Sequence, residues 1–88
     1  MKLPKLKSGD LVIVSWLDAF SLREPWTNEE DLDLSPDYSF DSVGYYVSSS
    51  KKYFVLAGDR ADANDGGQVA YGRVHYLPLG MIEKVERC

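Results

Sequence analysis

The chain has 88 residues, enough for one domain with a modest core and too few for two. Ten basic and fourteen acidic residues give a net charge of −4. This balance argues against a general nucleic-acid binder, whose phosphate contacts need clustered cations, and against adsorption to anionic membranes. Hydrophobic residues make up 44% of the chain, which excludes global disorder.

Cysteine content and hydropathy indicate where the protein acts. The single cysteine, Cys88, cannot form an intramolecular disulfide, which favours a reducing compartment. No run approaches the roughly 18 apolar residues of a membrane span, and residues 1–8 form a basic lead-in without the apolar region of a signal peptide. We therefore expect a cytoplasmic protein that does not bind membranes.

The first predicted strand covers residues 11–17 and follows a turn at residues 8–10. The β-branched run Val12, Ile13 and Val14 disfavours a helix here. Because the first four residues of this strand are all apolar, both of its faces need cover.

Residues 20–42 differ in composition, and we interpret them as an acidic insert. Seven acids and no base lie from Glu24 to Asp41, so this stretch carries −7 and the rest of the chain +3. Thr27 followed by Glu30 fits a capping box at the start of a short helix over residues 28–34. We expect hydrophobic side chains of the insert to dock it onto the rest of the protein: Trp26, Leu32, Leu34, Tyr38 and Phe40.

Four more strands are predicted after the insert, over residues 42–48, 53–57, 69–76 and 81–86. A polar hairpin loop at 49–52 joins the first two, a loop over residues 58–68 precedes the third, and a 3₁₀ turn at 77–80 precedes the last. Gly44 indicates a bulge or a close backbone approach. Residues 53–57 are apolar on both faces.

This order of elements predicts a mainly β fold, a small SH3-like five-stranded barrel forming a single domain over residues 1–88. Partial closure of the barrel protects the edges of such a sheet. A small barrel has only one interior, yet two strands are apolar on both faces. The outside must therefore be covered, either by the folded-back insert or by a second copy of the chain.

Several short motifs occur in an order that resembles a family of small uncharacterised proteins encoded by phages and prophages. Its pattern is Trp-x-Asp-Ala, a second Trp in an acidic segment, Val-Gly-x-x-Val, Val-Leu-Ala and a closing Pro-x-Gly-x-Ile. The matching residues are Trp16 to Ala19, Trp26, Val43 to Val47, Val55 to Ala57 and Leu77 to Ile82. The resemblance implies an SH3-like fold and a phage-type origin, and it brings no activity.

Catalytic and metal-binding patterns are missing from the sequence. The one histidine, His75, is expected on a strand face, and there is no Gly-x-Ser-x-Gly motif. Zinc sites need clustered cysteine and histidine, and the oxygen-rich loop at 59–66 lacks the ligand spacing of a calcium loop. We therefore predict a non-enzymatic protein with no metal and no cofactor.

The acidic insert is the first candidate site. A run of like charges is commonly just a solvated surface, but this one can also steer a basic protein partner at close contact. The leading hypothesis is therefore protein–protein contact, with a host or phage protein bound through Glu29, Glu30, Asp31 and Asp33. In this hypothesis the protein is a phage accessory factor that acts on, and can inhibit, a host factor.

The second candidate site is an aromatic pocket formed by Trp16, Asp18 and Trp26. In the alternative interpretation, the aromatic residues belong to the core and Asp18 caps a turn. If the pocket forms, it can stack a base, while Arg60 and Arg73 hold a phosphate. Tyr46 joins the candidates because Tyr45 and Tyr46 point to opposite faces. This hypothesis is a nucleotide sponge at a homo-oligomer interface, and a third is a structural subunit of a larger assembly.

Overall fold

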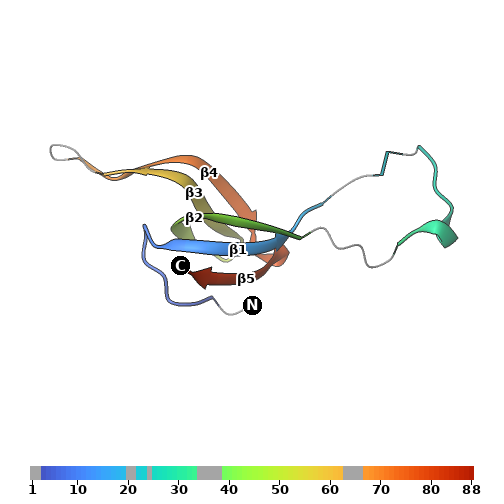
Figure 1. Cartoon of the computed structure of the whole chain (residues 1–88), viewed down its shortest axis with the longest axis horizontal. Coiled ribbons are helices and arrows are strands. Elements are labelled where there is room, and N and C mark those ends of the chain that lie inside the picture. The colour runs from blue at the N-terminus through green and yellow to red at the C-terminus, as the bar shows by residue number, and fades with distance from the viewer. Residues whose placement is uncertain (1–2, 20–21, 24, 34–38, 63–66) are drawn as a thin grey trace.

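The computed structural model describes residues 3–19, 22–23, 25–33, 39–62 and 67–88, and its regular structure is mainly β. Two single-turn 3₁₀ helices accompany five strands (Figure 1). The elements in chain order are β1 (Leu11–Leu17), η1 (Glu29–Asp31), β2 (Ser39–Ser49), β3 (Tyr53–Ala61), β4 (Ala70–Pro78), η2 (Leu79–Met81) and β5 (Ile82–Arg87). In the part of the chain described, no helix is long and apolar enough to cross a membrane.

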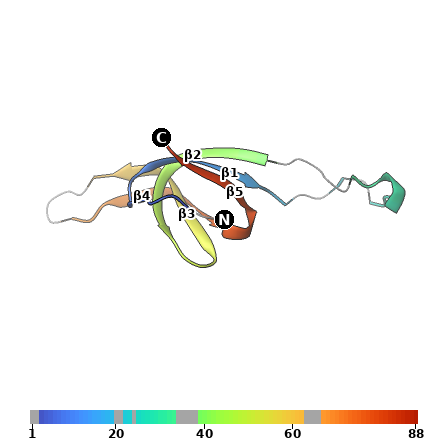
Figure 2. The same cartoon turned by 90° about the horizontal axis from the view of Figure 1, so that it is seen from below.

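The five strands form one antiparallel sheet in the order β4-β3-β2-β1-β5. This confirms the mainly β fold and the number of strands. No pairing between the edge strands β4 and β5 is found among the described residues, so hydrogen bonds do not close the sheet into a barrel. β2 is strongly curved (Figure 2), because its first part pairs with β1 and its last part pairs with β3.

The core lies on the inner face of this curved sheet. Val12 and Val14 alternate toward it from β1, as the period of two in a strand requires. They pack with four further buried residues, Phe54, Leu56, Leu77 and Ile82. The strand over residues 11–17 has the bounds predicted, and Phe54 to Ala57 are buried on both faces of β3 as expected.

The predicted helix at residues 28–34 is a single 3₁₀ turn, η1. Asn28, and not Thr27, is its N-cap, and no side chain caps it by hydrogen bonding, so the capping box is wrong. Short helices need tertiary packing to be stable in water, and η1 has no buried residue, while Leu32 and Trp26 beside it are exposed. Leu34 and Tyr38 lie outside the described residues.

The loop predicted at 58–68 begins later than predicted, after Ala61, and β4 begins at Ala70, one residue later than predicted. β3 continues to Ala61 because Asp59 pairs with Gly72 and Arg60 with Tyr71, so the hairpin extends as a two-stranded ribbon. The turn at Asp65 and Gly66 lies outside the described residues. β2 begins at Ser39, earlier than predicted, because its first residues pair with the end of β1.

The outer face of the sheet keeps an exposed apolar surface. Leu11, Ile13 and Val43 lie on it, and Val43 is 63% exposed. Residues 22–23 and 25–33 of the insert do not cover this face, since they project beyond the end of β1 (Figure 1). Cover by a second copy of the chain stays a prediction.

Candidate functional site

Residues 22–23 and 25–33 of the insert form an arm that extends away from the sheet (Figure 1), whereas residues 39–42 belong to β2. We call this arm the acidic arm. Glu29, Glu30 and Asp31 occupy successive positions in η1, and all three are exposed. Asp33 follows them and is exposed too. The structure therefore presents these four carboxylates to solvent.

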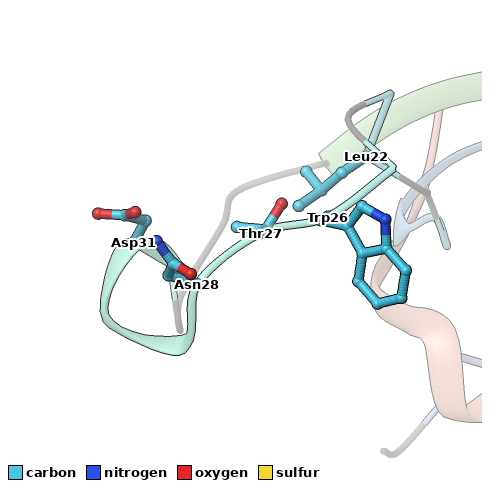
Figure 3. Close-up of a pocket in the computed structure, with 5 residues that line it drawn as sticks. All are labelled: Leu22, Trp26, Thr27, Asn28 and Asp31. Carbon is cyan, nitrogen blue, oxygen red and sulfur yellow. The ribbon is translucent and has the colours of Figure 1, made fainter.

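Trp26 lies on the same arm and is 90% exposed. It borders an open hollow formed with Leu22, Thr27, Asn28 and Asp31. Figure 3 shows Leu22 and Trp26 on the part of the arm nearer the sheet, with Asn28 and Asp31 at its far turn. A large aromatic side chain exposed beside carboxylates can be buried against a partner, while the carboxylates attract basic groups around it.

The predicted pocket of Trp16, Asp18 and Trp26 does not form. β1 ends at Leu17, so the strand face that Trp16 and Asp18 would share ends before Asp18. The carboxylate of Asp18 instead accepts a hydrogen bond from the Ala19 N–H (2.8 Å). Trp26 borders a different hollow, on the acidic arm.

Trp16 lines a groove on the inner face of the sheet. Its indole Nε1 donates a hydrogen bond to Ser42 Oγ (3.0 Å), and its ring lies 5.4 Å from that of Phe40. A cavity of about 170 Å³ opens beside it, lined by Trp16, Ser42, Leu56, His75 and Leu77. A second cavity, of about 270 Å³, shares three of these residues and adds Gly58, Arg73 and, from the outward-facing side of β2 at the gap, Val43.

The groove exists because β2 and β3 separate. They pair as far as Tyr45 and Ala57, and beyond that point β2 follows β1 while β3 follows β4. Ser42 and Gly58 thus border a gap between strands that are neighbours elsewhere. The structure brings Trp16 and Arg73, two of the predicted ligand residues, to this one groove.

Arg73 has an unusual backbone and an ion-paired side chain. Its φ of 49° is in the left-handed region, which non-glycine residues seldom adopt. Its Nε and Nη2 donate to the two carboxylate oxygens of Asp59 (2.7 and 3.1 Å). Through these hydrogen bonds Arg73 lowers the pKa of Asp59 below its ordinary value of 3.8, and Asp59 in turn raises the pKa of Arg73.

The pKa of Asp59 gives a testable pH dependence. A carboxylate whose pKa is lowered by folding stabilises the fold above its ordinary pKa, and this contribution is lost as the pH falls through the lowered value. In a carbon-13 NMR titration we expect the Asp59 midpoint below 3.8, and Arg73→Gln should return it toward 3.8. An Asp59 midpoint unchanged by Arg73→Gln would contradict the pair.

The other two ligand candidates lie elsewhere. Arg60 forms an ion pair with Asp62 (2.6 Å) and lies near Gly9, so it does not join Arg73 in holding a phosphate. Tyr46 packs against the core residue Phe54, with ring centroids 5.2 Å apart, and its hydroxyl contacts Ser49. Neither residue lines the groove.

His75 and Ser42 are groove residues that the sequence interpretation did not select. Arg73, His75 and Leu77 recur at every second position, and all three line the groove. That alternation is the signal that could have grouped them. The described residues contain no cluster of three or more groups able to hold a metal ion.

Comparisons with protein-family models, with curated proteins and with solved structures found no match. The structure itself defines a small antiparallel β protein with two distinct surface features. One is the acidic arm with its exposed tryptophan, and the other is the groove between the separated parts of β2 and β3.

Proposed function

We propose that this chain is a non-enzymatic binding protein that acts through protein–protein contact by its acidic arm. The observation that carries the proposal is the 90% exposure of Trp26 on an arm that also presents Glu29, Glu30 and Asp31. Tryptophan is among the residues most enriched in binding hot spots, while carboxylates beside it raise the rate of encounter with a basic surface. The partner proposed is a host or phage protein with a basic patch around an apolar pocket.

The wider setting belongs to the same proposal. The strand order, with β1 between β2 and β5 and a 3₁₀ turn before β5, supports an SH3-like, partly closed barrel. The motif order around Trp16 and Gly44 supports a phage-type accessory factor. A single cysteine supports a cytoplasmic site of action.

Capture of partner proteins from a bacterial lysate tests the role of the arm. Trp26→Ala removes the apolar anchor, and we expect it to weaken binding of any specifically captured protein by about thirtyfold, the effect of losing a hot spot of 2 kcal/mol. The triple variant Glu29→Gln, Glu30→Gln, Asp31→Asn should slow association and reduce its dependence on salt.

A matched control removes the same charge from outside the arm. Asp62→Asn, Glu83→Gln and Glu86→Gln neutralise three acids outside the arm, and this variant should capture the same proteins as the unmodified chain. The measurement is affinity for each captured protein at low and high salt. The proposal is wrong if every captured protein binds equally well to the Trp26→Ala chain.

A further inference from the structure

The groove on the inner face joins two chemically different spaces. The cavity of about 170 Å³ has an apolar floor supplied by Trp16, Leu56 and Leu77. Its size is close to that of an engineered apolar cavity of about 150 Å³ that holds one benzene ring. The adjoining cavity of about 270 Å³ has Arg73 and Ser42 in its wall. His75 lines both spaces.

The polar groups of this wall are mainly hydrogen-bond donors. Ser42 Oγ already accepts the Trp16 N–H, so its own proton is left to donate. Arg73 uses Nε and Nη2 for Asp59, and its Nη1 has no partner in the contacts of the described residues. The same pair with Asp59 holds the guanidinium at Gly58, where an added Cβ would lie 3.0 Å from Arg73 Cζ.

We propose that this groove binds a small ligand composed of one aromatic ring and one oxyanion group. The ring occupies the apolar cavity against Trp16, and the oxyanion lies in the adjoining cavity, within reach of Arg73, Ser42 and His75. An arginine guanidinium and a hydroxyl donor suit phosphate or carboxylate oxygens. The site lies within one chain, so it needs neither a second copy nor the acidic arm.

Phenyl phosphate is the probe that tests both halves of the site. The chain has two tryptophans, so Trp26→Phe leaves Trp16 as the sole indole reporter in the groove. We expect a saturable change in Trp16 fluorescence on titration with phenyl phosphate. Phenol lacks the oxyanion and inorganic phosphate lacks the ring, and each should bind at least about tenfold more weakly, the cost of losing one well-placed interaction.

Two substitutions separate the role of Arg73 from general effects of charge. In the Trp26→Phe background, Arg73→Gln should weaken phenyl phosphate binding about tenfold, as expected for a hydrogen bond to a charged group. Gly58→Ala should weaken it in the same direction, because the new Cβ displaces the guanidinium. Arg60→Gln removes an equal charge outside the groove and should leave binding unchanged.

Three results would overturn the proposal: no saturable fluorescence change, equal binding of inorganic phosphate and phenyl phosphate, or equal weakening by Arg73→Gln and Arg60→Gln. These outcomes are independent of the acidic arm, since every titration uses a chain that lacks the Trp26 indole. A failure of protein capture therefore leaves this test intact.

Discussion

Phe54→Ala is expected to remove most of the stability of the fold. Phe54 is fully buried in β3, where it pairs with Leu77 across the hairpin and packs its ring on Tyr46. Truncating a buried phenylalanine costs about 3–5 kcal/mol, because the lost transfer free energy is joined by the cost of a cavity. A domain of this length has about 4–13 kcal/mol in total. Urea unfolding followed by circular dichroism measures the loss.

The neighbouring residue provides the control for Phe54. Tyr53 lies on the opposite face of the same strand, is 42% exposed, and meets Tyr76 edge to face at 5.9 Å. Tyr53→Ala should therefore cost about 1 kcal/mol or less, the range of an exposed aromatic contact. Equal losses for the two variants would mean that the inner face of β3 is not the core.

The strands could be predicted from the sequence because their signal is local. The β-branched run Val12 to Val14 indicated a strand at β1, and the continuous apolar run from Phe54 marked a strand buried on both faces. Local patterns of this kind reflect the period of two and the preference of branched side chains for strands. Closure of the sheet into a barrel by hydrogen bonds between β4 and β5 depends on how far the sheet curves. The order of strands in the sequence does not show that curvature.

The acidic arm shows why docking is harder to predict than charge. The carboxylates of Glu29, Glu30 and Asp31 are exposed as the charge run predicts. The hydrophobic residues Trp26 and Leu32 were expected to dock the insert onto the rest of the protein, because large apolar side chains are usually at least partly buried. Burial requires a complementary surface, and no local pattern in the arm shows whether one is within reach. The capping box failed for the same reason, since it describes a helix end without supplying the packing that stabilises the helix.

The groove combines residues that only strand register can bring together. Trp16 and His75 are far apart in sequence and lie on strands that do not pair with each other. Their proximity follows from the separation of β2 and β3 beyond Tyr45. The left-handed backbone of Arg73 also carries no sequence signal, because glycine or asparagine is the usual residue in that conformation.

Gly44→Ala is expected to be the next most destabilising substitution. Gly44 is buried in β2 where the strand changes partner, and an added Cβ would lie 2.5 Å from the Ala57 carbonyl oxygen and 3.0 Å from Leu56 Cγ. The first contact is with backbone, so no side-chain rotation relieves it and the strands must shift. Forced overpacking costs about 1–3 kcal/mol, and contact with backbone places Gly44 at the upper end. At 4–8 °C for each kcal/mol, we expect the melting temperature to fall by about 10–20 °C.

Gly80→Ala is the matched control for Gly44→Ala. A Cβ added at Gly80 meets nothing within 4 Å, so this substitution should change stability by less than about 0.5 kcal/mol. If the Gly44→Ala and Gly80→Ala chains melt at the same temperature, β2 does not approach β3 this closely at Gly44. The two strands would then not be in contact at the point from which they separate, and the groove would lose its structural basis.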